Sequence, residues 1–178
     1  VFFMKPADAV VANGVDVTYP SKTSNFHYEI ELVIAVGKQA KNVNVEDAKD
    51  YIYGYAVGND LTRRDLQLEL KAIGMPWDIS KGFDHSAPIS AIHPVSEIGH
   101  PTEGRIWLRV NGEIQQDGNI NQMIAKPSQI IAALSQLFVL EPGDLIYTGT
   151  PAGIGPVVAG DVMEAGIDGI DRLTTKII

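Results

Sequence analysis

The sequence predicts an α+β fold rich in β-structure, in which many short strands are joined by tight turns and the helices are few and short. Seventeen glycines and ten prolines are spread over 178 residues, a density typical of short strands with tight turns. Hydrophobic residues make up 45% of the chain and charged residues 20%, as expected for a globular domain with a substantial core. There is no internal repeat and no linker, so residues 1–178 are predicted to form one domain.

The first half of the chain alternates strand-like and helix-like segments. Residues 1–19 are β-prone and punctuated by glycine, asparagine and proline, which predicts short strands and turns. The strongest strand is expected over 27–36, where apolar residues dominate. After it we expect a short helix over 46–52, a strand over 53–57 interrupted by Gly54, and a helix over 62–73 that stops at Gly74-Met75-Pro76.

The second half has two local signals of high specificity. Asn111-Gly112 lies between alternating runs at 106–110 and 113–116, which predicts a β-hairpin with a type I′ turn. A helix is expected over 127–138, because proline is favoured in the first turn and apolar residues follow at helical spacing. The rest should be a turn at 141–144, a strand at 145–148, a Gly/Pro-rich loop at 149–156 and strands to the C-terminus.

Composition narrows the possible functions. The net charge is −8 and no cluster of lysine and arginine occurs, which argues against a nucleic-acid partner. Cysteine is absent, so disulfides, thiolate metal sites and cysteine nucleophiles are excluded and any metal must take oxygen or imidazole ligands. No stretch resembles a signal peptide or approaches the roughly 20 apolar residues of a membrane span. A cytoplasmic protein without a membrane partner is predicted.

Two acidic residues, Glu29 and Glu31, interrupt the strongest predicted strand. Because side chains alternate between the faces of a strand, both should lie on one face, about 7 Å apart. Val33 and Ala35 make this face apolar further along, so the strand is expected to be largely buried. Two ionised carboxylates there need a cation, a basic partner or a raised pKa. A solvated edge of an ordinary strand is the alternative interpretation.

A third carboxylate, Asp60, lies in the polar segment 58–65. An apolar strand ends there in a polar turn just before a helix, where folded proteins often place ligand-binding groups. Three carboxylates without a thiolate favour Mg²⁺ or Mn²⁺, with Ca²⁺ also possible, and water completing the coordination. The sequence therefore predicts a divalent-metal site at Glu29, Glu31 and Asp60.

Several motifs occur in the order found in one enzyme family. They are His27-Tyr28-Glu29-Ile30-Glu31, the stretch from Gly54-Tyr55 through Asn59-Asp60-Leu61-Thr62-Arg63-Arg64-Asp65, Lys81-Gly82-Phe83-Asp84, and Leu145-Ile146-Tyr147-Thr148-Gly149-Thr150-Pro151-Ala152-Gly153-Ile154-Gly155. Together they cover essentially the whole chain, which resembles the fumarylacetoacetate hydrolase-domain family. Phe3-Met4-Lys5-Pro6 and Met75-Pro76-Trp77 resemble its acylpyruvate hydrolase branch, including fumarylpyruvate hydrolases.

The resemblance implies a fold, an assembly and a set of site residues. The expected fold is a mixed β-sandwich roll with short helices, usually a homodimer, with Mg²⁺ or Mn²⁺ in its cleft. The matching positions are Glu29, Glu31 and Asp60 for the metal, Arg64, Gln67 and Lys81 as catalytic residues around the substrate and the attacking water, and Lys5 and Thr150 on the substrate side.

Four of these assignments have a structural alternative. Arg64 could form an ion pair with the adjacent Asp65, and Gln67 could be a structural residue of its helix. Lys5 before a proline and Lys81 before a glycine could be solvated surface lysines.

One feature of the branch is missing from the sequence. In the branch, a His–Glu pair on a mobile segment upstream of the Phe-Met-Lys-Pro motif activates the water. The sequence starts at Val1 without a methionine, so it is interpreted as lacking an N-terminal lid segment that carries this pair. His27 lies beside the ligand strand and is expected to orient the site rather than replace the base.

The implied reaction is hydrolysis of the carbon–carbon bond of an acylpyruvate, a 2,4-dioxo acid such as fumarylpyruvate, in the catabolism of aromatic compounds. The substrate would chelate the metal, water would attack the distal carbonyl, and pyruvate and a carboxylic acid would be released. The same site would also serve an oxaloacetate decarboxylase or an isomerase/decarboxylase of aromatic catabolism. A catalytically silent, metal-stabilised binding domain is a further alternative.

Overall fold

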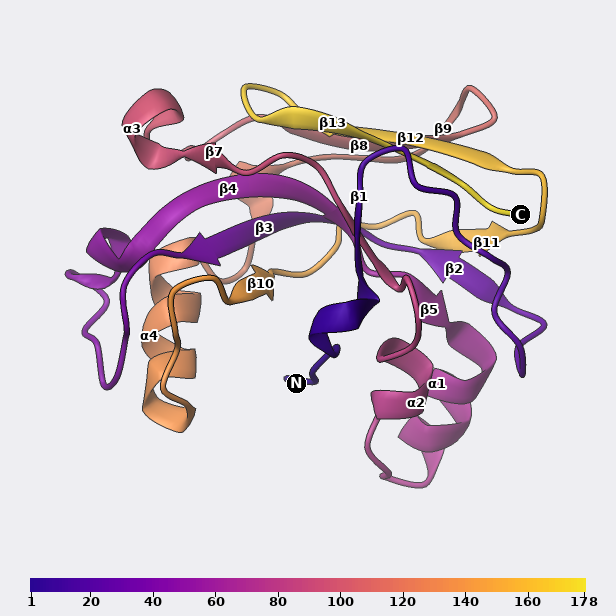
Figure 1. Ribbon diagram of the computed structural model, residues 1–178, viewed down its shortest axis with the longest axis horizontal. Coiled ribbons are helices and arrows are strands. Elements are labelled where there is room, and N and C mark those ends of the chain that lie inside the picture. The colour runs from indigo at the N-terminus through magenta and orange to yellow at the C-terminus, as the bar shows by residue number, and fades with distance from the viewer.

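The computed structural model describes residues 1–178 and consists of three β-sheets with short helices, an α+β fold rich in β-structure as predicted (Figure 1). The first sheet contains β1 (Val10–Ala12), β3 (Ile30–Val36), β4 (Ile52–Asn59), β6 (Ala87–Ile89), β7 (His93–Pro94) and β10 (Leu145–Tyr147). The second contains β2 (Phe26–Tyr28), β5 (Thr62–Arg63) and β11 (Gly155–Val157). The third contains β8 (Arg105–Val110), β9 (Glu113–Asn119), β12 (Val162–Ile167) and β13 (Asp171–Lys176). The first sheet is mixed, because β1 and β6 are parallel while its other pairs are antiparallel.

The helices lie at the periphery of the sheets. They are α1 (Arg64–Ala72), α2 (Asp78–Lys81), α3 (Val95–Ile98) and α4 (Pro127–Leu137), together with the 3₁₀ turns η1 (Ala7–Ala9), η2 (Ala48–Tyr51) and η3 (Ile120–Gln122). Figure 1 shows the curved β3 and β4 beneath the flatter β8–β9–β12–β13 sheet, with α4 on one side and α1 and α2 on the other. None of these helices has the length and apolar character needed to cross a membrane.

One hydrophobic core of 29 buried residues joins the three sheets and α4. Strand β3 is central to it, since Ile30, Leu32 and Ile34 point into this core while Val33 packs with Ala56 and Ile89 on the opposite face. All seven residues of β3 are buried. The prediction that this strand is covered on both faces is confirmed, so any charged group on it must find its partners inside the protein.

The single strand expected over 27–36 is in fact two strands that belong to different sheets. β2 pairs with β5 and β11, whereas β3 pairs with β4 and β10, and Glu29 lies between them. The reason is local hydrogen bonding, because the Glu29 N–H donates to the Asn59 side chain (2.8 Å) and the Glu29 carbonyl accepts from the Asp60 N–H (2.8 Å). The chain therefore changes sheets at the first predicted metal ligand.

Two predicted helices are shorter than expected. The helix over 46–52 is only the 3₁₀ turn η2, since its few residues cannot offset the cost of nucleating an α-helix. The helix over 62–73 begins at Arg64, because Thr62 and Arg63 pair with β2 as β5. The strand predicted at 53–57 is longer, Ile52–Asn59. Gly54 pairs with Ala35 within its ladder, and the irregularity lies at the adjacent Tyr53, which the pairing skips.

Two other predictions are confirmed closely. The hairpin β8–β9 turns at Asn111 (φ 51°) and Gly112 (φ 85°), the positive φ values that a type I′ turn requires. Helix α4 starts at Pro127 as expected and ends at Leu137, one residue before the predicted end.

Candidate metal centre and substrate site

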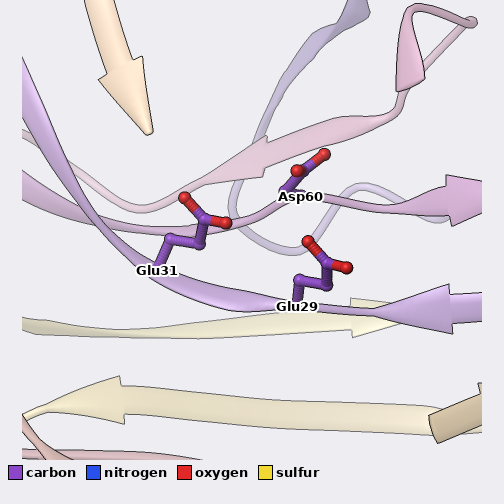
Figure 2. Close-up of side chains that lie close together, drawn as sticks. All are labelled: Glu29, Glu31 and Asp60. Carbon is purple, nitrogen blue, oxygen red and sulfur yellow. The ribbon is translucent and has the colours of Figure 1, made fainter. Parts of the chain in front are cut away.

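Three carboxylates converge at the junction of β2, β3 and β4. One oxygen each of Glu29, Glu31 and Asp60 lies within 4.8 Å of the other two, and Figure 2 shows Glu29 and Glu31 extending from one stretch of chain while Asp60 comes from the neighbouring one. The three residues are 7%, 4% and 1% exposed. This excludes the alternative of a solvated strand edge, because the carboxylates are removed from bulk water.

The strand ladder explains why these three side chains meet. Glu31 is paired with Gly58 of β4, and Asp60 follows the last residue of that strand. The backbone bond from the Asp60 N–H to the Glu29 carbonyl places the first and third carboxylates side by side. Sequence spacing predicted the cluster, whereas the side chain of Asn59, which holds Glu29 in place, carried no signal of its own.

The size of the cluster fits a small divalent cation. Oxygen ligands about 2.1 Å from an octahedral ion lie about 3 to 4.2 Å apart, so closing from 4.8 Å needs only sub-ångström side-chain shifts. An all-oxygen donor set suits Mg²⁺ and Mn²⁺. Three protein ligands would leave room for water or substrate.

Glu31 is the one carboxylate of the cluster without a positively charged partner. Its carboxylate accepts one hydrogen bond, from the Gly149 N–H at 2.6 Å, and has no ion-pair partner, while Glu29 and Asp60 both have basic partners. Burial, and then the neighbouring Asp60, raise the pKa of Glu31 well above its ordinary value. A bound cation would remove this penalty, since it favours the ionised form.

Lys81 is the central basic residue of the site. Its side chain is 1% exposed, and its ammonium group lies 2.9 Å from Glu29 Oε2, 2.6 Å from Asp60 Oδ2 and 2.7 Å from Thr62 Oγ1. These three acceptors match its three N–H donors. The alternative of a solvated lysine is therefore excluded, and Lys81 holds two of the carboxylates in position.

Arg64 and Gln67 form a polar group next to Glu29. The Arg64 guanidinium donates to Glu29 Oε1 and to Gln67 Oε1, and its Nε is buried without a partner. Asp65 instead accepts hydrogen bonds from Thr23 (2.6 Å) and the Ser24 N–H (2.8 Å). The alternative of an Arg64–Asp65 ion pair is thus wrong, because Arg64 points toward the carboxylate cluster.

Lys5 reaches the cluster from the N-terminal segment. Its ammonium lies 2.8 Å from Asp60 Oδ1 and donates to the carbonyls of Leu61 (3.0 Å), Lys81 and Ser86 (3.0 Å). Burial lowers the pKa of Lys5, an effect that Asp60 opposes. Lys5 is therefore a buried charge that ties the N-terminal segment to the site, and not the surface lysine considered above.

Thr150 and His27 lie at the edges of the site. Thr150 follows Gly149, whose N–H binds Glu31, and its Oγ1 accepts a hydrogen bond from Gln116 Nε2 at 2.8 Å. His27 bonds through Nε2 to Asn25 Oδ1 (2.8 Å), and burial together with Arg64 lowers its pKa to about 4. The role of each in catalysis stays a prediction.

Sequence reasoning missed two polar residues that support the cluster. Thr62 accepts from Lys81 and donates to the Asp60 carbonyl (2.9 Å), although it stands within the motif around Asp60. Gln116 lies far away in sequence, on β9, and is 0% exposed. The only signal of Gln116 in the sequence is its place at the end of the second strand of the predicted hairpin.

Comparison with known proteins gives consistent matches over the whole chain. The family model described as fumarylacetoacetate (FAA) hydrolase C-terminal matches residues 1–178. A fumarylpyruvate hydrolase of Ralstonia is 44% identical over 99% of this chain and 91% of its own length. A mitochondrial oxaloacetate tautomerase of Homo sapiens is 42% identical, over 99% of this chain and 80% of its own.

A solved structure supports the same relationship. Fumarylpyruvate hydrolase from Pseudomonas aeruginosa, in complex with Mn²⁺ and pyruvate, superposes with a TM-score of 0.98 at 47% sequence identity. The match covers 100% of this chain and 78% of that one.

Proposed function

This chain belongs to the fumarylacetoacetate hydrolase C-terminal family, and we propose that it hydrolyses the carbon–carbon bond of an acylpyruvate such as fumarylpyruvate with the help of Mg²⁺ or Mn²⁺. The observation that carries the proposal is the buried cluster of Glu29, Glu31 and Asp60, with Glu31 lacking any basic partner. The 47% identical fumarylpyruvate hydrolase that binds Mn²⁺ and pyruvate supports the choice of substrate class.

The reaction consumes one water molecule. The water oxygen forms a bond to the distal keto carbon of the acylpyruvate, and the bond between that carbon and the pyruvyl methylene breaks. The electron pair leaves as pyruvate enolate, which takes up a proton at carbon to give pyruvate, and the other product is a carboxylic acid. A divalent cation held by Glu29, Glu31 and Asp60 would supply Lewis-acid polarisation of the keto-acid oxygens.

The basic residues have distinct tasks in this proposal. Lys81 holds the carboxylates of Glu29 and Asp60 in position, and its buried positive charge favours negative charge that develops on the substrate. Lys5 adds a second fixed positive charge beside Asp60. Because all three of its N–H donors have carbonyl acceptors, we propose that Lys5 acts on the substrate through charge rather than through a direct hydrogen bond.

Three groups retain hydrogen-bonding capacity for the substrate or water. The carbonyl of Gln67 accepts from Arg64, which leaves the Gln67 amide N–H groups to orient the attacking water. Arg64 Nε is a buried donor without a partner. The Thr150 hydroxyl accepts from Gln116, so its own proton is free to bind a substrate carboxylate.

Oxaloacetate is the second candidate substrate, favoured by the 42% identical oxaloacetate tautomerase and the 41% identical oxaloacetate decarboxylase of Dictyostelium discoideum. Oxaloacetate presents the same 2-keto-acid head group as an acylpyruvate. Tautomerisation or decarboxylation would therefore use the same carboxylate cluster and differ at the far end of the substrate.

A direct assay separates these activities. Pyruvate release from fumarylpyruvate, acetylpyruvate and oxaloacetate is measured with Mg²⁺, Mn²⁺ or EDTA, and enol-to-keto conversion of oxaloacetate is followed by ultraviolet absorbance. We expect EDTA-sensitive pyruvate release to be fastest with an acylpyruvate. Turnover of oxaloacetate alone would replace the proposal with the second candidate, and the absence of all turnover would favour a binding domain. We also propose that the enzyme is a cytoplasmic homodimer.

A further inference from the structure

Strand β9 of the hairpin β8–β9 buries a glutamine and exposes an isoleucine two residues before it. Gln116 is 0% exposed while Ile114 is 41% exposed. The pairing explains the inversion, since Arg109 faces Ile114 and the adjacent Leu108 faces Gln116, so that Gln115 is an extra residue in β9. Such a β-bulge re-aims a side chain and is common beside functional sites.

The buried amide of Gln116 connects two segments of the proposed site. Its Oε1 accepts from the N–H of Ile30, the residue between two proposed metal ligands, at 3.0 Å. Its Nε2 donates to Thr150 Oγ1 at 2.8 Å and to the Pro151 carbonyl at 2.9 Å. The Ile30 N–H and the Pro151 carbonyl fix which end of the amide is oxygen, so the opposite orientation is excluded.

The loop that carries Thr150 is held against β3 and β9 by further contacts. The Thr148 hydroxyl donates to the Leu32 carbonyl (2.8 Å), and the Gly149 N–H donates to Glu31 (2.6 Å). At Gly153 (φ 97°) a side chain would collide with the Gln115 carbonyl, so the loop lies directly on the bulge. Gln116 is the one side chain that bonds to both the ligand strand and the Thr150 loop.

We infer that Gln116 is a positioning residue that fixes the Thr150 hydroxyl relative to the metal-binding strand and leaves the hydroxyl proton to donate to the substrate. The hydroxyl of Thr150 can accept and donate at once, and the hydrogen bond from Gln116 occupies the accepting side. This inference rests on the proposed function, because it assumes that the keto-acid ligand binds beside Thr150.

The test compares Gln116→Met, which keeps the side-chain length but removes both hydrogen-bonding ends, with Gln116→Asn, which keeps an amide too short to span both partners. Five quantities are measured for each protein: the Kd of Mn²⁺ by calorimetry, the Kd of pyruvate for the Mn²⁺-loaded protein, KM and kcat for an acylpyruvate, and the thermal midpoint. Misplacement of a group that positions the substrate by about 1 Å lowers the reaction rate by up to about 100-fold.

We expect both variants to raise KM and the Kd of pyruvate about 10- to 100-fold, with the Kd of Mn²⁺ changed by less than about threefold, since Glu29, Glu31 and Asp60 are retained. Thr150→Val should have a similar effect, and the double variant Gln116→Met/Thr150→Val should be no worse than Thr150→Val alone. Such non-additivity is what a residue acting through Thr150 must show.

Ser135→Ala is the matched control. Ser135 is also buried and makes two hydrogen bonds, from the Val43 N–H and to the Ala132 carbonyl (both 2.9 Å), but it lies on α4 without a bond to the site. It should lower the thermal midpoint while leaving both Kd values and KM unchanged.

Three results would overturn the inference: unchanged pyruvate affinity and KM in both Gln116 variants, effects that add fully to those of Thr150→Val, or failure of both variants to fold. Failure of the proposed function is distinguishable, because wild-type protein would then release no pyruvate from any acylpyruvate. Pyruvate binding would still report on the link between Gln116 and Thr150 in that case.

Discussion

Replacing Glu31 with glutamine should separate metal binding from folding. Glu31 is 4% exposed, has no basic partner and has an oxygen within 4.8 Å of oxygens of Glu29 and Asp60. Two unit charges at that distance repel by about 3.5 kcal/mol at an effective dielectric constant of about 20. The Glu31→Gln variant removes one of these charges and keeps an oxygen that can accept from the Gly149 N–H.

In the absence of metal, the variant should be at least as stable as the wild-type protein. If Glu31 is ionised the substitution relieves repulsion, and if Glu31 is protonated the amide replaces a neutral group of similar size. An ordinary substitution at a buried position destabilises by about 1 kcal/mol or more. The sign of the change in the free energy of unfolding therefore distinguishes Glu31 from a structural carboxylate.

In the presence of metal, the order should reverse. At a Mn²⁺ concentration 100 times the Kd, the wild-type protein gains about 2.7 kcal/mol, which raises the thermal midpoint by about 5 to 11 °C for a chain of this size. Even the loss of a residue that only hydrogen-bonds to a metal ligand weakens metal binding about 10- to 100-fold. The loss of a charged ligand should therefore raise the Kd of Mn²⁺ at least about 100-fold. The same Mn²⁺ concentration then adds only about 0.4 kcal/mol, or about 1 to 2 °C.

The assay is thermal unfolding by calorimetry with EDTA or with Mn²⁺. Glu69→Gln is the control, since it removes the same charge from an exposed position on α1. An equal Mn²⁺-dependent rise in Glu31→Gln and in the wild type would refute the metal site at Glu31. A loss of stability in EDTA would show instead that Glu31 has a structural role that its contacts do not reveal.

Three further predictions concern the groups around the cluster. Lys81→Met should lower metal-free stability by about 3 to 5 kcal/mol in urea unfolding, because it removes the buried ammonium that pairs with both Glu29 and Asp60 and leaves each with one basic partner, Arg64 or Lys5. Mn²⁺ should restore part of the loss, and an effect below about 1 kcal/mol would contradict this. Asp60→Ala should abolish turnover with near-native circular dichroism, and loss of the folded state would mean that the cluster is mainly structural. His27 has a folded-state pKa of about 4, below its ordinary 6.5, so the unfolded state binds the proton first and stability should fall as pH drops from about 6.5 to about 4. Stability measured against pH should be flatter over this interval in His27→Gln, and an identical slope would exclude His27 as the cause.

The sequence predicted the features that depend on local chemistry. Asn111-Gly112 and Pro127 set the turn of the β8–β9 hairpin and the start of α4, because positive φ and a missing N–H leave few alternatives. Glu29 and Glu31 were predicted to share one face of a strand and to meet Asp60 from the polar segment before a helix, and the three carboxylates do lie together. Their role as metal ligands stays a prediction.

Features that depend on contacts distant in sequence were not predictable. The break at Glu29 requires the Asn59 side chain to replace a ladder bond, and the burial of Gln116 requires a β-bulge that no residue pattern announces. The ammonium of Lys5 lies against carbonyls 56 to 81 residues away in sequence. Such contacts exist only once the sheets have assembled.

The pairing of β3 with β4 has a consequence for how this site can vary. Glu31 faces Gly58 and Ile30 faces Asn59 across a ladder. A slip by one residue would turn Glu31 to the opposite face of the sheet. An insertion or deletion within either strand would therefore separate the three carboxylates, whereas length changes around residues 149–156 would leave them together. The lengths of β3 and β4 are therefore what keeps the three carboxylates together.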